Sequence, residues 1–207
     1  MTNITVTGAA EARVSADQAD VFASVSRHDA SRETALQGAN EAHGKLVEKA
    51  KSLVAEGIAS HYVAEPVATY SNSWRDERGN NVVEHQAHAS IRIVITALDH
   101  AGQVAAELTE SGADVRVQWE LGAALRDEWT RKLRSEAVAD ARAAAEDFAA
   151  AIAAADLTLL SLRDGRTGGG PSPVGDVRMA MAAAAAPEVT VGQIAVGVQV
   201  EATFTAE

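Results

Sequence analysis

Two β-strands that follow each other without an intervening helix open this chain, and this feature constrains the fold most. The first strand contains Ile4-Thr-Val-Thr-Gly8, and in the second, apolar Val21, Ala23 and Val25 alternate with polar residues. An apolar side chain at every second position is typical of a strand with one solvent-exposed face. Strands joined in this way predict antiparallel pairing, so the fold must accommodate hairpins as well as helices.

The opening strands begin almost at Met1, which leaves no room for a signal peptide, a transit peptide or a membrane anchor in front of them. We therefore expect a cytoplasmic protein. A periplasmic or secreted location is the alternative if the native protein has residues in front of this methionine.

Strands and helices alternate through the rest of the chain. Apolar periodicity and the turn residues between periodic segments set the expected bounds. The elements expected after the opening pair are a helix at 31–56, extended segments at 61–74 and 82–97, a short helix at 99–112, a strand at 115–121, a long helix at 126–155, and strands at 157–162 and 194–204. The polar tip 75–81 joins the two extended segments into a long hairpin. The apolar positions change from odd to even numbers before the closing strand, which predicts a bulge or a kink at Gly192.

This order, β-β-α-β-β-α-β-α-β-β, predicts an α+β fold: a two-layer sandwich in which helices cover a mainly antiparallel sheet. Neither a repeat nor a linker divides the sequence, so we expect a single domain over residues 1–207 with a protruding hairpin at 61–97. Residues 164–187 contain three consecutive glycines and a run of alanines. A structureless loop of this length is unusual inside a compact domain, so we expect a flexible loop, a partner-binding arm or a short extra helix there.

Composition excludes several classes of function. The chain has 207 residues, 47% of them hydrophobic, and a net charge of −11. Binding to nucleic acid needs clustered Lys and Arg, so we expect no nucleic-acid partner. The absence of cysteine excludes disulfides, thiolate catalysis and cysteine-based metal sites. No apolar run has the length and character of a membrane-spanning helix, so we expect no membrane insertion.

Glu84, His85 and His88 form the closest cluster of potential metal ligands. Residues three apart on a strand point to opposite faces, so His85 and His88 converge on one metal only if the strand bulges, whereas Glu84 and His88 share a face. Solvated strand residues are the simpler interpretation of the cluster. No nucleophile motif is present, and prolines follow the glycines at 168–170 where a phosphate-binding loop needs Lys. We therefore expect no enzyme activity, no catalytic residue and no cofactor.

The long helix is rich in alanine. Its expected buried stripe recurs at spacings of three and four and consists of Trp129, Leu133, Ala137, Ala141, Ala144, Phe148 and Ile152. Further alanines occupy its outer faces at Ala139, Ala143, Ala150 and Ala154. These outer alanines either reflect helix propensity alone or form a self-association surface, because small side chains let a second backbone approach closely.

Three segments of the chain carry a family resemblance. The first is Ile4-Thr-Val-Thr-Gly8 together with Asp17-Gln18-Ala19-Asp20-Val21. The second is the strand and helix from Ala87 to Gly112-Ala113. The third is Leu133–Ala145, which leads to the closing strand at 194–204. Together they resemble the SIMPL-domain family, which includes bacterial periplasmic immunogenic proteins and proteins implicated in oxidative-stress defence.

The resemblance covers nearly the whole chain, with departures at two positions. Ala10 stands where the family often has a second glycine, and Ala16 replaces the usual proline before Asp17. The resemblance implies an α+β fold and a tendency to form symmetric oligomers. It brings no catalytic residue that could be carried over to this chain.

Two hypotheses about function remain open at this point. The first is a non-enzymatic, self-associating homo-oligomer of the SIMPL type that acts through protein contacts, with a role in stress. The second is a small-ligand or metal-binding protein, or an unrecognised enzyme, that uses the region of Glu84, His85 and His88 or the loop at 164–187.

Overall fold

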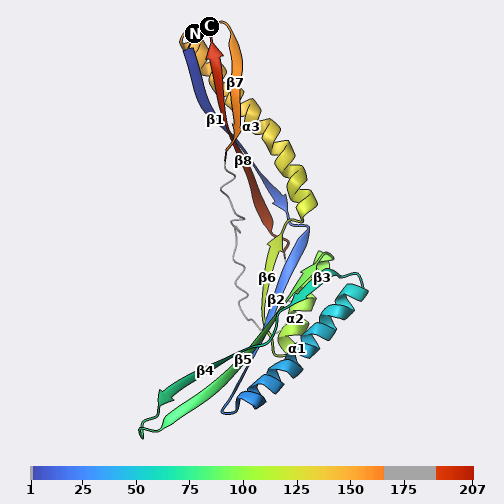
Figure 1. The fold of residues 1–207 in the computed structure, drawn as a ribbon. Helices are drawn as coiled ribbons and strands as arrows, with labels where there is room; N and C mark the ends of the chain where they lie inside the picture. Colours follow the sequence, from blue (N-terminus) through green and yellow to red (C-terminus); the bar gives the residue numbers. More distant parts are fainter. Residues whose placement is uncertain (1, 166–189) are drawn as a thin grey trace. The chain divides into compact units, whose positions relative to one another are not determined.

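The computed structural model describes residues 2–165 and 190–207, which form two compact units (Figure 1). The first unit comprises the described residues 2–16, 121–165 and 192–207. The second comprises 17–120 with 190–191. The chain thus leaves the first unit after its opening strand and returns to it for the long helix and the last two strands.

The first unit is a three-stranded antiparallel sheet with one long helix on one face. The strands β1 (Thr2–Ser15), β8 (Gln193–Ala206) and β7 (Leu157–Asp164) lie in the order β1-β8-β7. β1 and β8 pair along their full lengths, from Thr2 opposite Ala206 to Ser15 opposite Gln193. Even-numbered side chains of β8, from Ile194 to Ala206, are buried beneath the helix, as the alternating pattern predicts.

The helix α3 (Ala123–Ala151) packs closely on β1 because small residues line the contact. A Cβ atom at Gly8 would lie 2.1 Å from the carbonyl oxygen of Ala137 and 2.4 Å from the backbone nitrogen of Ala141. The buried residues of α3 recur every fourth position: Leu133, Ala137, Ala141, Ala145 and Ala149. The predicted stripe is therefore right for Leu133, Ala137 and Ala141. Trp129 and Ala144 are only half-buried, and Phe148 and Ile152 are exposed.

The second unit is a five-stranded antiparallel sheet with two helices on one face. Its strands are β2 (Gln18–Asp29), β3 (Ala59–Ala64), β4 (Ala68–Arg75), β5 (Asn81–Ile95) and β6 (Asp114–Glu120). The order is β3-β5-β2-β6, and β4 also pairs with β5, beyond the end of β3. Helix α1 (Arg32–Ala55) packs on β2, β3 and β5, whereas α2 (Ala101–Glu110), which follows the short 3-10 turn η1 (Leu98–His100), packs on β6 and β2.

Local signals set the ends of these helices. Ser31 caps α1 by accepting a hydrogen bond from the backbone N–H of Thr34, and α1 ends before Gly57, whose φ of 74° suits glycine. Gly112, with a φ of 86°, stops α2 in the same way. Between the helices and the sheet lies an aliphatic core, whose largest fully buried side chains are Leu46, Leu53, Ile91, Ile93, Ile95 and Leu108.

The α+β class and the antiparallel pairing are confirmed, with three differences in detail. The strands form two sheets rather than one. The predicted segment 61–74 is two strands, because Pro66 cannot donate to a ladder and separates β3 from β4, so the order gains one strand. β8 begins at Gln193, so Gly192 precedes the strand and is not a bulge within it. The single domain over 1–207 stays a prediction. Of the loop predicted at 164–187, Asp164 ends β7, and residues 166–187 lie outside the described part.

Candidate functional site

One face of the five-stranded sheet is polar and turned away from α1 and α2. From Ala19 to Val25 on β2 and from Ala87 to Ile95 on β5, the odd-numbered side chains are buried against the helices, so the even-numbered ones point to the other side. We call this surface the open face. A shallow hollow of about 290 Å³ lies on it, lined by Phe22, Ala23, Ser24, Ser90, Asp114, Val115 and Arg116.

A phenyl ring lies between two arginine positions on the open face. Phe22 on β2 is opposite Arg92 on β5 and opposite Arg116 on β6. The guanidinium carbon of Arg116 lies 4.7 Å from the centroid of the Phe22 ring, a cation–π distance. Arg92 instead pairs with Asp20, at 3.2 Å between Nη1 and Oδ2. Asp20 is buried, and its other carboxylate oxygen has no hydrogen-bond partner among the described residues.

The next row of the open face carries hydroxyl and carboxyl groups. Ser24 lies opposite Ser90 on one side and Asp114 on the other. The Ser90 hydroxyl donates to the Glu65 carboxylate. The hollow therefore offers a cation, a carboxylate and a hydroxyl beside an aromatic ring, which is chemistry suited to holding a small polar ligand.

A serine and a histidine meet farther along the same face. Ser26 Oγ and His88 Nδ1 are 3.1 Å apart, because Ser26 is directly opposite His88 in the register. An activated serine also needs a third group that orients the histidine. Within residues 2–165 and 190–207, no third group is hydrogen-bonded to the other ring nitrogen of His88.

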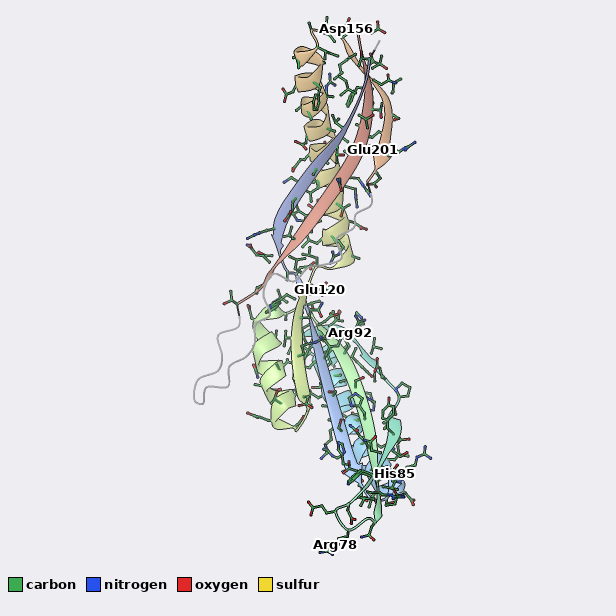
Figure 2. The ribbon with its side chains drawn as sticks, turned by 90° about the vertical axis from the view of Figure 1, so that its left-hand side faces the viewer. Arg78, His85, Arg92, Glu120, Asp156 and Glu201 are labelled. Carbon is green, nitrogen blue, oxygen red and sulfur yellow. The ribbon has the colours of Figure 1, made fainter. Side chains whose placement is uncertain are left out.

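The three residues predicted as metal candidates do not converge. His88 contacts Ser26, and Glu84 Oε2 lies 3.3 Å from His28 Nδ1, both on the open face. His85 is on the opposite face of β5, because the strand runs without a bulge from Asn81 to Ile95 in its pairing with β2 and β4. The part of the chain that the structure describes contains no group of three His, Asp or Glu residues placed to hold a metal ion. Figure 2 shows His85 and Arg92 on the sheet of the second unit.

The first unit presents a second candidate surface, which is apolar. Helix α3 packs on β1 and β8 but barely on β7, so the outer strand is left uncovered. Five large side chains are between 47% and 59% exposed, two at the carboxyl end of α3 and three on β7: Phe148, Ile152, Leu159, Leu160 and Leu162. We call them the apolar strip. Sequence analysis missed the strip because it placed Phe148 and Ile152 in the core.

The edges of the same sheet are protected against strand addition. The backbone N–H of Ala9 points outward from β1 and donates to the Asp140 carboxylate of α3, at 3.0 Å. In β7 the register shifts between Leu159 and Ser161, so the strand bulges at Leu160. Side-chain covers and bulges are devices that keep an edge strand from pairing with another chain. Asp140 on β1 and the bulge on β7 therefore each hinder pairing of an edge strand with another chain.

Comparison with known protein families gives a match. The family model described as SIMPL, protein of unknown function (DUF541), matches residues 4–204. Among curated proteins, none is similar enough to this chain to count as a match. The match extends over both units. No helix in the described ranges is both long enough and apolar enough to cross a membrane.

Proposed function

This chain belongs to the SIMPL family, and we propose that it functions by self-association through the apolar strip of its first unit, without catalysis. The exposed side chains of Phe148, Ile152, Leu159, Leu160 and Leu162 carry the proposal. Single exposed apolar residues are ordinary, whereas a group of large ones on neighbouring elements is typical of an interaction surface.

The partner that fits this strip is a second copy of the chain. The helix that contributes Phe148 and Ile152 also exposes alanines at Ala139, Ala143 and Ala150, and small side chains allow two helices to approach closely. Twofold dimers are by far the commonest assembly, and they use the same patch on both copies. The exposed apolar side chains of α3 and of β7 can meet those of a symmetry mate in this way.

Face-to-face contact is favoured over strand addition. Asp140 occupies the outward N–H of Ala9 on β1, and the bulge at Leu160 interrupts β7. A second copy that added a strand at either edge would have to displace one of these features. Docking on the strip displaces neither of them and removes apolar area from water.

The stress-related role implied by the family resemblance is retained as part of this proposal, as is the absence of enzyme activity. Neither depends on the hollow of the open face. A growth comparison under peroxide, with the wild-type gene and a strip variant, measures whether the self-associating form serves that role.

Size-exclusion chromatography with light scattering tests the proposal directly. We expect the wild-type mass to exceed that of a monomer and to rise with protein concentration. The double variant Phe148→Ser, Leu162→Ser should be monomeric at the same concentrations. Both side chains are about half exposed or more, so their loss removes the contact and leaves the fold intact. The matched control is Val63→Ser, an equally exposed apolar residue of the second unit that should keep the wild-type mass.

A further variant separates the two modes of association. Asp140→Ala frees the edge of β1 and leaves the strip unchanged, so association through the strip predicts a mass equal to that of the wild type. A higher mass for Asp140→Ala alone would place the contact at the strand edge. A wild-type protein that is monomeric at every concentration would overturn the proposal.

A further inference from the structure

The outer half of the β4–β5 hairpin carries two exposed aromatic side chains on one face. Tyr70 is 60% exposed and Trp74 is 47% exposed. Asn72 lies between them on the same face, because side chains two apart on a strand point the same way. β2 ends its pairing with β5 where Asp29 lies opposite His85, and the hairpin continues beyond that point (Figure 1).

The opposite strand completes this surface. Gln86, Glu84 and Val82 lie directly across from Tyr70, Asn72 and Trp74, in that order. These six residues are the aromatic face. Two rings stand at its ends, with amide and carboxylate groups between them. Four residues at roughly 3.3 Å each separate the rings by about 13 Å along the strand.

We propose that the aromatic face binds an unbranched, uncharged polysaccharide. The flat carbon–hydrogen face of a pyranose ring packs on an aromatic ring, whose face carries partial negative charge. The sugar hydroxyls are donors and acceptors that the side-chain amides of Asn72 and Gln86 can satisfy. The two aromatic rings are separated along one strand and have amide groups between them. A polysaccharide matches this arrangement because it presents flat carbon–hydrogen faces and hydroxyl groups repeatedly along its length.

Charge decides between this ligand and single-stranded nucleic acid, which also stacks on exposed aromatic rings. A nucleic-acid groove needs Lys or Arg along the phosphate backbone. The six described residues of the aromatic face include neither, and the one ionised group among them is the carboxylate of Glu84. The whole chain carries a net charge of −11. The face therefore lacks the cations that nucleic acid and acidic polysaccharides need, which leaves neutral polysaccharides.

A protein partner fits this surface less well. The centre of a protein interface is depleted of charged residues and packs apolar groups together. Here Asn72, Glu84 and Gln86 interrupt the apolar surface between the two rings. The apolar strip of the first unit, in contrast, consists of large apolar side chains alone.

Titration of the full chain with chitohexaose and with cellohexaose tests the proposal, followed by tryptophan fluorescence and calorimetry. We expect saturable binding of at least one hexasaccharide, with a change in fluorescence that Trp74→Phe abolishes while binding persists. Each of Tyr70→Ser and Trp74→Ser should weaken binding roughly three- to tenfold, the size of a single aromatic contact. Tyr70→Phe keeps the ring and should bind like the wild type.

Val83→Ser is the matched control, because Val83 is exposed on the opposite face of the same hairpin. It should leave the affinity unchanged. An equal loss of affinity in Val83→Ser, or no saturable binding of either sugar at millimolar concentration, would overturn the proposal. So would a Tyr70→Ser, Trp74→Ser double variant that changes the oligomeric mass and not the sugar affinity. The strip variant Phe148→Ser, Leu162→Ser should bind sugar normally, so failure of self-association and failure of sugar binding are separate results.

Discussion

Replacing Gly8 by alanine should destabilise the first unit, because the new methyl group has no space. Its Cβ would lie 2.1 Å from the Ala137 carbonyl oxygen, 2.4 Å from the Ala141 nitrogen and 2.7 Å from the Ala141 Cβ. Two of these three atoms belong to the backbone of α3, so no side-chain rotation relieves the contact. The helix has to move away from β1.

The size of that movement sets the cost. The shortest contact must lengthen by about 1.3 Å to reach 3.4 Å, where ordinary van der Waals contact begins. A gap of about 1 Å removes a quarter to a half of the dispersion energy between facing groups. Here the facing groups are the buried row of α3 from Leu133 to Ala149 and the strands beneath it. Overpacking typically costs about 1–3 kcal/mol. We expect about 3 kcal/mol for Gly8→Ala because only backbone can yield.

Thermal unfolding followed by circular dichroism or calorimetry measures the effect. A loss of about 3 kcal/mol lowers the Tm by roughly 6–12 °C if all 207 residues unfold together. If the two units unfold separately, only one transition should move, and it should move farther. The same experiment therefore tests the prediction of a single domain.

Gly197→Ala is the matched control in the same sheet. A Cβ at Gly197 would meet only the Ala10 carbonyl oxygen, at 3.8 Å, which is an ordinary contact. This substitution should be neutral or stabilising by up to about 1 kcal/mol, because alanine restricts the unfolded chain. Equal Tm values for Gly8→Ala, Gly197→Ala and the wild type would refute the close approach of α3 to β1.

Three smaller predictions concern the second unit. In the hairpin turn, hydrogen bonds from the Asn80 side chain and backbone lower the pKa of Asp76 below its usual value of 3.8. The carboxylate therefore stabilises the turn at pH values above 3.8, and this stabilisation is lost as the pH falls through the lower pKa of the folded protein. An NMR titration midpoint for Asp76 at or above 3.8 would contradict this. Ser31→Ala should lower the free energy of unfolding by about 1 kcal/mol in denaturant titrations, because α1 loses its N-terminal cap. Ser31→Asp keeps a capping oxygen and should be as stable as the wild type. Equal stability of the wild type and both variants would argue against the cap. Lys49 of α1 and Glu107 of α2 form an ion pair, with 2.5 Å between Nζ and Oε2, and both side chains are about a third exposed. A double-mutant cycle should therefore give a coupling energy below about 1 kcal/mol, and this energy should decrease with added salt.

The strands were easier to predict than the helix contacts, and the reason lies in the side chains. Along β5, Ala87, Ala89, Ile91, Ile93 and Ile95 are all buried, as their alternation with polar residues predicts. On α3 most candidate positions are alanine, which gives no contrast between one row and the next. Spacings of three and four describe a straight stripe, whereas the observed spacing of four turns the buried row by about 40° at each step. Such a row follows the twist of the strands beneath it, and it carries Phe148 and Ile152 away from the sheet.

The candidate surfaces depended on strand register, which a single strand does not reveal. The pattern of β5 correctly separates the face of Glu84 and His88 from the face of His85. It does not reveal that Ser26 is the neighbour of His88. In the same way, Phe22 and Arg116 are far apart in sequence and meet only because β2 pairs with β6. Partners across a sheet are set by which strands pair and in which register, and both follow from the packing of the whole unit.

The pairing of β1 with β8 also determines the order in which the chain can fold during its synthesis. Of the described strands, β1 leaves the ribosome first, and its partner, Gln193–Ala206, leaves it last. At about 5–20 residues per second, β1 waits roughly ten to forty seconds for β8. Residues 17–120 are complete long before then and can fold while translation continues. Throughout that interval Ile4, Val6 and Val14 of β1 are without the cover that they have in the folded chain, so a chaperone that shields apolar segments has a reason to bind β1.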